Sequence, residues 1–360
     1  MTNQHSRITR FLRWFDFQKL LGISTSSIIF RKIPEKVTWL VKFHLGRAIN
    51  HLSWNSKQNA KRLSRFIKRT NPDGKIFFQI AMPNTLQYII PCINSIPDKV
   101  KGHKISLVLI SNGLSSWEVG YLKKRTNLPL FELNLRLSCP ISHGHVLNIL
   151  FDSCLSNFGI IDHDIYGVTD DIWGNLLDQP PDYLRGLYKV SNPNLKWSFP
   201  RTHLMVFNRN NIQNLMTKYN VGAQQYRQAP QKLQNILNSL GLPKGSFLKP
   251  YLQYFDSLNL IMVLIRHEGG TPEICPDYLE RNVHHIGGTS GRSLHDSNIL
   301  SRYTDIRFMM MENSDQLLKM YSFMIGETSN IERLCKRLEE IPVVQSNKQR
   351  IDTILNKIKN

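Results

Sequence analysis

Two aspartates, Asp162 and Asp164, follow a short apolar run in the stretch GIIDHDIYGVTDD of residues 159–171. In an extended chain, alternation places both carboxylates on one side, with His163 between them facing the other way. Neighbouring carboxylates repel each other unless a cation lies between them, and such oxygen ligands suit Mg²⁺ or Mn²⁺ together with a substrate phosphate. The pair therefore indicates a divalent metal site. The alternative is that these acids cap the turn or helix that follows.

Other groups could act with this pair. His284 and His285 precede the glycine-rich stretch GGTSGRS of residues 287–293, and neutral imidazole is a good metal ligand. Alternation would turn one histidine into a site and the other away from it, and the alternative is a core histidine beside a surface one. The loop amides, with Arg292, could approach a phosphate. Asp256 lies in the apolar stretch YFDSLNLIMVLI, which is predicted to be a late apolar helix. A carboxylate there needs a partner or a role, or caps a helix.

Strands and helices alternate after residue 74. The apolar patterns predict strands at 75–82, 103–112, 128–133 and 159–164, and helices at 84–96, 115–126 and 143–158. Ser115 and Glu118 have the spacing of a capping box at the start of the second helix. This alternation predicts a parallel sheet covered on both faces. Because such sheets bind ligands beyond the carboxyl ends of their strands, Asp162 and Asp164 should lie at a ligand crevice.

The positive charge of the chain is concentrated in an N-terminal arm. The net charge is +19, and residues 1–70 hold 15 Lys and Arg against 2 Asp and Glu, whereas the rest of the chain carries only +6. Three of the six tryptophans, Trp14, Trp39 and Trp54, lie in this arm. Aromatic and basic residues together suit an anionic membrane surface or nucleic-acid phosphates. A helical extension whose aromatic side chains pack on the body is the third interpretation.

The 360 residues, 41% of them hydrophobic, suffice for one large domain or two ordinary ones. No apolar run approaches the ~20 residues that span a bilayer, and the N-terminus lacks the pattern of a secretory signal. Five scattered cysteines without a C-x-x-C pair indicate reduced thiols. We expect a cytoplasmic protein, peripheral on the inner face of the membrane if the arm binds lipid.

The order of these motifs over about residues 75–290 resembles the GT-A glycosyltransferases that use nucleotide sugars, most closely glycosyltransferase family 2. In that family the first strand ends in a proline- and asparagine-containing turn, the second strand ends in a loop that holds the nucleoside, and a Gly- and Asn-bearing helix precedes the D-x-D motif. The donor-binding residues that the resemblance implies are Pro83, Asn84, Asn112, Gly144, Asn148 and Asp162. Asn112 and Ser111 stand where the family usually has an aspartate.

The resemblance implies an α/β fold with a GT-A-like, mostly parallel sheet flanked by helices. The basic helical arm would cover 1–70, the GT-A-like domain 71–300 and a helical C-terminal tail 301–360. The implied activity is that of a metal-dependent, hexosyltransferase-like glycosyltransferase. It would move a sugar from a nucleotide-diphosphate donor to a glycan or lipid-linked acceptor, for cell-surface polysaccharide.

The resemblance also implies roles for single residues. Asp162, Asp164 and His285 would bind Mn²⁺ or Mg²⁺. Asp256 would be the general base that accepts the proton of the acceptor hydroxyl, with Asp170 and Asp171 as alternatives for that role. The competing hypothesis is a basic nucleic-acid-binding protein or a metal-dependent phosphodiesterase. It is less favoured because the charge excess lies in the arm and no nucleic-acid motif appears.

Overall fold

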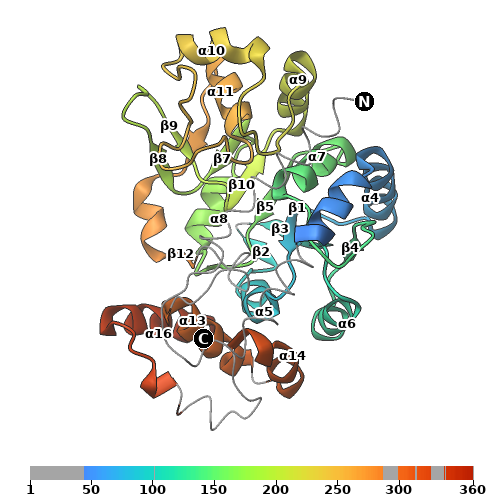
Figure 1. The fold of residues 1–360 in the computed structure, drawn as a ribbon, viewed down its shortest axis with the longest axis vertical. Coiled ribbons are helices and arrows are strands. Elements are labelled where there is room, and N and C mark those ends of the chain that lie inside the picture. The colour runs from blue at the N-terminus through green and yellow to red at the C-terminus, as the bar shows by residue number, and fades with distance from the viewer. Residues whose placement is uncertain are drawn as a thin grey trace.

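The computed structural model describes residues 44–100, 102–286, 299–312, 314–325, 336 and 338–359. The predictions for Trp14, Trp39 and Arg292 fall outside these residues. Figure 1 shows a central sheet with helices packed on both of its sides.

Parallel strands form one half of the central sheet. Their order is β4–β3–β1–β5, and their bounds are β1 (Lys75–Ala81), β3 (His103–Ser111), β4 (Leu130–Glu132) and β5 (Phe158–Ile161). The strands are nearly continuous apolar runs because both faces of a parallel sheet are covered. Gly159 leaves β5 room for the ring of Phe77 on β1, which occupies the space where a Cβ would lie. All four strands therefore end at the same edge of the sheet.

Antiparallel pairing extends the other half of the sheet. β10 (Leu204–Phe207) runs antiparallel to β5 and to β7 (Leu184–Gly186), and β11 (Glu273–Ile274) then runs parallel to β7. β2 (Lys99–Val100) pairs with the start of β3. Two small sheets stand apart, and they join β6 (Ile165–Tyr166) to β12 (His284–His285) and β8 (Lys189–Ser191) to β9 (Ser198–Pro200).

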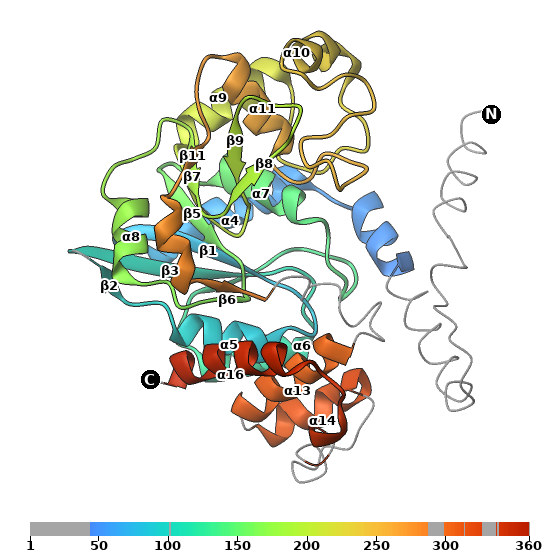
Figure 2. The ribbon, with the colours of Figure 1, turned by 90° about the vertical axis from the view of Figure 1, so that its left-hand side faces the viewer.

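Helices cover the two faces of the sheet as separate groups (Figure 2). One face carries α4 (Ser56–Thr70), α7 (His143–Ser153), α9 (Arg209–Tyr219), α10 (Gln234–Ser239) and α11 (Asn259–His267). The other carries α5 (Leu86–Asn94), α6 (Ser116–Arg125) and the C-terminal helices α13 (Ile299–Glu312), α14 (Asp315–Ile325) and α16 (Gln345–Lys359). Successive β1 residues serve the two cores: Phe78 packs in the first and Phe77 in the second, as strand alternation requires. The short elements α8 (Asp170–Leu177), η1 (Gln231–Leu233) and η2 (Asp277–Asn282) complete the fold.

The predicted fold class is confirmed: the protein is α/β, with a mostly parallel sheet flanked by helices. Each predicted strand and helix of residues 75–158 is present, and the capping box of Ser115 and Glu118 forms as expected. Two boundaries were wrong. The fourth strand ends at Ile161 rather than at residue 164, and the late apolar helix begins only at Asn259. Asp256 therefore precedes that helix instead of lying within it.

The described part of the arm is helical, over residues 44–52 and again in α4. Asn50 fastens the first helical segment to the body, because its side-chain amide donates to the carbonyls of Leu137 (2.9 Å) and Cys139 (2.7 Å). The described C-terminal residues are also helical, as predicted. Among the residues that the structure describes, no helix combines the length and apolar character that crossing a membrane requires.

Candidate active site

The turn between β5 and β6 holds Asp162 at the carboxyl edge of the parallel strands. Its backbone amide donates to the carbonyl of His203, 2.7 Å away, in the residue just before β10. Its carboxylate Oδ2 lies 3.0 Å from the Nδ1 atom of the same histidine. The antiparallel pairing of β10 with β5 therefore brings His203 onto Asp162, although 41 residues separate them along the chain.

Asp164 faces a different histidine. The pairing of β6 with β12 sets His285 opposite Ile165, and its Nε2 atom lies 3.3 Å from Oδ1 of Asp164, a carboxylate only 4% exposed. His284 is opposite Tyr166 and, by alternation, faces the other side of this small sheet. Of the two histidines that the sequence offered, His285 is the one that reaches the acids.

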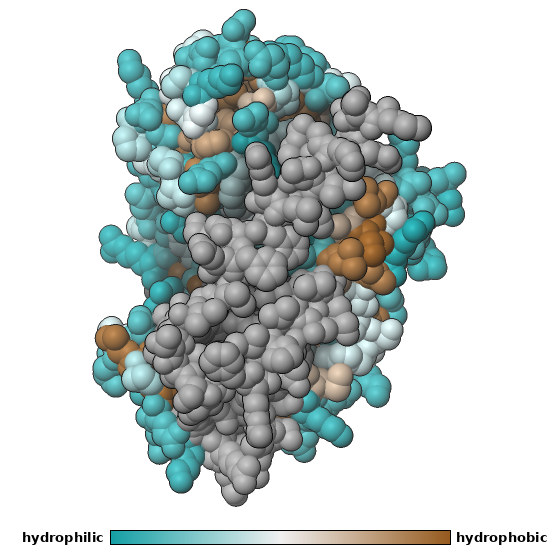
Figure 3. Space-filling view, in the orientation of Figure 1, coloured by the Kyte–Doolittle hydropathy of each residue, from teal (hydrophilic) through white to brown (hydrophobic). Residues whose placement is uncertain are grey.

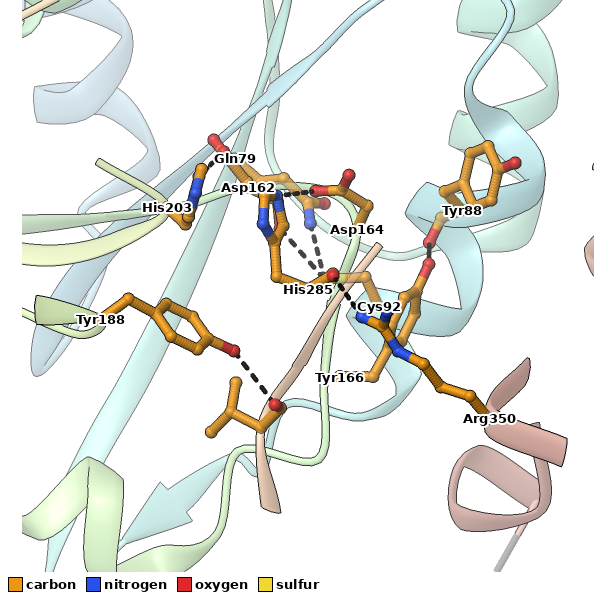
Figure 4. Close-up of polar contacts among 11 residues, drawn as sticks. Gln79, Tyr88, Cys92, Asp162, Asp164, Tyr166, Tyr188, His203, His285 and Arg350 are labelled. Carbon is orange, nitrogen blue, oxygen red and sulfur yellow. Dashed lines mark hydrogen bonds and ion pairs between the residues drawn. The ribbon is translucent and has the colours of Figure 1, made fainter. Parts of the chain in front are cut away.

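The two acid–histidine pairs meet in one cluster (Figure 4). The rings of His203 and His285 are in contact at a tilt of 32°, with centroids 3.6 Å apart. One possible ligand atom from each of Asp162, His203 and His285 lies within 4.8 Å of the others. Asp164 hydrogen-bonds His285, which is the carboxylate–histidine arrangement that orients imidazole ligands at metal sites. Two of the three predicted metal ligands, Asp162 and His285, thus lie together with His203, whereas Asp164 contacts His285 and is not part of this group of possible ligands.

The charge on His285 depends on its neighbours. Burial is the strongest single influence and lowers the pKa of His285. The hydrogen bond and negative charge of Asp164 and the charge of Asp162 act in the opposite direction and together outweigh burial, so the net pKa is raised. Arg350 of α16 donates to the carbonyl of His285 at 3.2 Å. Tyr188 lies beside both histidine rings and donates to the carbonyl of Val283 at 3.1 Å. A residue from the C-terminal helices therefore contacts the strand that carries this histidine.

Asp256 lies in the turn before α11 and forms an ion pair. Its Oδ2 atom is 2.7 Å from Nζ of Lys249, whose side chain is 8% exposed against 22% for the aspartate. Gln225 donates to the other oxygen at 3.0 Å, and the amide of Ser257 does so at 2.8 Å. Burial is the strongest influence and would raise the pKa of Asp256, but Lys249 and the two hydrogen bonds together hold it below its usual value. The carboxylate is therefore kept ionised.

His143, the first residue of α7, connects the two acidic positions. Its pKa is lowered chiefly by burial, and the negative charges of Asp162 and Asp256 both act on it in the opposite direction. The His143 imidazole therefore senses the charges of both Asp162 and Asp256.

The residues predicted to bind the donor occupy two different environments. Pro83 and Asn84 lie in the turn after β1, where Asn84 has a left-handed backbone (φ 64°) and its amide donates to Glu118 at 2.7 Å. Asn112, after β3, is fully buried, and its amide group exchanges two hydrogen bonds of 3.0 Å with the backbone of Ile141. Asn112 thus holds the loop in place, and its role toward a nucleotide stays a prediction.

Gly144 and Asn148 fasten α7 to the segment before Gln225. A Cβ on Gly144 would lie 2.5 Å from the carbonyl oxygen of Ala223, so a glycine is needed for this close approach. Asn148 accepts from the amide of Ala223 at 2.6 Å and donates to the side chain of Gln224 at 2.7 Å. In the structure these two residues position the segment that reaches Asp256.

Asp170 and Asp171, the alternative bases, lie exposed in the first turn of α8. Acidic residues there are favoured by the helix dipole.

His203 is the residue that the sequence reasoning missed. Its segment forms β10 and α9 in the structure, and only the register of β10 against β5 identifies the histidine.

Comparison with known proteins agrees with the resemblance read from the sequence. Residues 53–212 match the family model of the StrH glycosyltransferase N-terminal domain, a stretch that contains Asp162, Asp164 and His203. No curated protein matches the chain.

Solved structures with some similarity include three glycosyltransferases. The mannosyltransferase PcManGT from Pyrobaculum calidifontis, in complex with GDP-Man and Mn²⁺, is 10% identical, with 90% of this chain and 96% of that chain covered and a TM-score of 0.32. S. aureus TarS 1-349 is 12% identical, with 73% and 91% covered and a TM-score of 0.28. Glucosyl-3-phosphoglycerate synthase from Mycobacterium tuberculosis is 13% identical, with 61% and 85% covered and a TM-score of 0.30. TM-scores this low support no functional argument.

Residues 53–212 are thus similar to the StrH glycosyltransferase N-terminal domain, and the glycosyltransferase activity predicted from the sequence is confirmed.

Proposed function

We propose that this glycosyltransferase moves a sugar from a nucleotide-diphosphate donor to a glycan or lipid-linked acceptor, in the synthesis of a cell-surface polysaccharide. The cluster of Asp162, His203 and His285 carries the proposal. It lies at the carboxyl edge of the parallel strands, which is where α/β sheets bind their ligands. The diphosphate of a nucleotide sugar is the part of the donor that such a cluster, loaded with a divalent cation, would bind.

The donor set of the cluster fits a divalent metal ion. Asp162 offers an oxygen ligand, and His203 and His285 offer imidazole nitrogens. Asp164 contacts the Nε2 atom of His285 and so orients its ring. Mg²⁺ prefers oxygen ligands in strict octahedral geometry, so the two imidazoles favour Mn²⁺ over Mg²⁺. A bound ion would supply positive charge against the negative charge that develops on the departing diphosphate.

Asp256 is the proposed general base. Lys249 keeps its carboxylate in the ionised form, which is the form that can accept a proton from an acceptor hydroxyl, while the lowered pKa makes it a weaker base than a free aspartate. The segment around it contacts α7 through Gly144 and Asn148, and α7 begins with the half-buried His143. These contacts support a base that is held at a fixed position relative to the metal cluster.

The acceptor side includes an anionic membrane surface in our proposal. Residues 44–70 contain seven Lys and Arg and no Asp or Glu. Leu45 and Leu52 are exposed there, the second by 88%, and Leu137 beside them is also exposed. Figure 3 shows hydrophobic surface in this part of the molecule. Exposed leucines within a basic surface suit the boundary of an anionic bilayer, which would place the enzyme on the inner face of the membrane.

A thermal-shift experiment tests the donor proposal. UDP and GDP are added to the full chain with and without Mn²⁺, and the unfolding midpoint should rise by a few degrees only when nucleotide and metal are both present, because ligands stabilise the folded state by mass action. Asp162→Ala should abolish the rise, whereas the matched control Asp178→Ala, at the exposed end of α8, should keep it. A rise of equal size in Asp162→Ala would overturn the metal assignment.

A vesicle experiment tests the membrane proposal. Lys61→Glu combined with Arg65→Glu should weaken sedimentation with phosphatidylglycerol vesicles by more than about tenfold, because each basic residue near the surface contributes about 1 kcal/mol. Leu52→Ser should also weaken it, while Leu155→Ser, which changes an equally exposed leucine of 76% on another part of the surface, should not. Unchanged sedimentation of the double charge variant would remove the membrane from the proposal.

A further inference from the structure

Glu118, the fourth residue of the capping box, carries more hydrogen bonds than a helix cap needs. Glu118 is only 2% exposed. Its Oε2 atom accepts from the amide and the hydroxyl of Ser115 at 2.8 and 2.7 Å. Its Oε1 atom accepts from the amide of Asn84 and from the hydroxyl of Tyr321, both at 2.7 Å. A carboxylate offers about four acceptor positions, and all of these positions are in use.

The donors to Glu118 come from three separate parts of the fold. Asn84 lies in the turn after β1, Ser115 lies in the turn after β3, and Tyr321 lies in α14 of the C-terminal helices. The carboxylate therefore joins the two turns at the edge of the sheet to each other and to α14. Because Asn84 has a left-handed backbone, which costs energy in a residue other than glycine, its hydrogen bond to Glu118 helps to hold that turn in its observed shape.

The C-terminal helices contact the same side of the domain at further points. Asp305 of α13 is buried and accepts hydrogen bonds from Tyr88 and from Gln87, the latter at 3.3 Å, both on α5 directly after the β1 turn. Arg350 of α16 reaches the carbonyl of His285, next to the metal cluster. Each of the three C-terminal helices thus touches an element that borders the proposed donor site.

We propose that the C-terminal helices position the donor-binding turns, and that Glu118 and Tyr321 are the positioning residues through which they do so. This inference rests on the proposed function, in which the nucleotide binds beside the turns after β1 and β3. A turn that is already held in its binding shape has less conformational freedom to lose when the ligand arrives. The contribution of Tyr321 should therefore appear in the affinity for the donor rather than in the rate of sugar transfer.

The test compares two tyrosine hydroxyls at the same interface. Tyr321→Phe keeps the ring, which packs on Trp117, and removes the hydroxyl from Glu118. Tyr121→Phe is the matched control, because Tyr121 also donates to a carboxylate between the domain and the C-terminal helices, that of Glu312 at 3.1 Å. Within the described part of the chain, Glu312 accepts from Tyr121 and Arg125 and not from the two turns, so both variants weaken the interface but only one releases Glu118.

Two measurements on the full chain decide the result. Without any ligand, hydrogen exchange of the amides of Asn84 and Ser115 should speed up about tenfold in Tyr321→Phe and stay at the parental rate in Tyr121→Phe. With nucleotide and Mn²⁺, Tyr321→Phe should raise the dissociation constant of the nucleotide, and the KM of the donor sugar, by roughly tenfold with kcat nearly unchanged.

The outcomes separate the two hypotheses. Equal exchange rates and equal nucleotide affinities in the two variants would overturn the positioning role, and so would a loss confined to kcat. If the parental protein bound neither UDP nor GDP, the proposed function would fail first. The exchange measurement would then still show whether Tyr321 fixes the two turns, and a parental rate in Tyr321→Phe would refute that as well.

Discussion

The buried ion pair of Lys249 and Asp256 gives a prediction that the structure makes quantitative. Lys249→Met keeps the length and apolar stem of the side chain and removes its charge. Asp256 then loses the cation at 2.7 Å and keeps two hydrogen bonds, from Gln225 and Ser257. Removing one partner of a buried pair costs about 3–5 kcal/mol, and because Asp256 keeps these two hydrogen bonds we expect the lower value, about 3 kcal/mol, at pH 7.

The pH dependence of this loss has a definite sign. In the parental protein the pKa of Asp256 is lowered, so its contribution to stability is present above the ordinary pKa of an aspartate and is lost as the pH falls through the lowered value. In Lys249→Met burial acts on Asp256 without the opposing cation, so the pKa of Asp256 should lie above its ordinary value. Asp256 should then become protonated as the pH falls, and the destabilisation of the variant should decrease. The difference in unfolding free energy should therefore be largest near pH 7 and should shrink toward pH 4.

Urea unfolding at several pH values measures this difference. The double variant of Lys249→Met with Asp256→Asn should recover most of the lost stability, because no uncompensated charge then remains buried. The control Lys218→Met removes a lysine from a solvent-exposed pair with Glu268 and should leave the urea midpoint nearly unchanged. A loss in Lys249→Met that is the same at pH 7 and pH 4 would show that packing, and not the charge of Asp256, causes it.

Three further substitutions test the geometry of the site and of the arm. His203→Ala should weaken Mn²⁺ binding by at least roughly 10- to 100-fold, which is what the loss of a supporting residue costs at a metal site. Titration calorimetry measures this affinity, and an affinity equal to that of the parental protein would exclude His203 from the ligands. Gly144→Ala should lower the unfolding free energy by about 1–3 kcal/mol, because the new Cβ would collide with the backbone of Ala223 and Gln224. An unchanged urea midpoint would contradict this close approach of α7 to the Ala223–Gln224 backbone. Asn50→Ala should cost about 1–3 kcal/mol by leaving carbonyls such as that of Leu137 unpaired, and faster proteolysis within residues 44–55 would report it.

The parallel part of the sheet could be predicted because its signal is local. β1 and β3 are mostly apolar runs, and each is followed by polar turn residues and a helix with its own apolar face. Ser115 and Glu118 marked the start of α6 three residues apart, and the predicted cap is present. Patterns of this kind depend on neighbours within one or two turns of chain, which the sequence displays directly.

The positions of the acids depended on boundaries that the pattern does not fix. Strand alternation was extended through residue 164, but β5 ends at Ile161, so Asp162 and Asp164 lie in a turn and each meets its own histidine. Asp256 was predicted within an apolar helix, yet the chain passes through a left-handed residue, Leu258, before α11 begins. A single residue with positive φ carries no periodic signal, so the start of that helix was placed too early.

The site itself is assembled by pairings between distant segments, and this explains why one of its residues was missed. His203 reaches Asp162 only because β10 runs antiparallel to β5, and His285 reaches Asp164 only because β12 pairs with β6. Shifting either pairing by one residue would turn the histidine to the opposite face. Because the proposed ligands come together as a set only when both pairings form, metal binding and the folding of this edge should be linked. Mn²⁺ should therefore slow hydrogen exchange in β6 and β12 of the parental protein and have no such effect in His203→Ala.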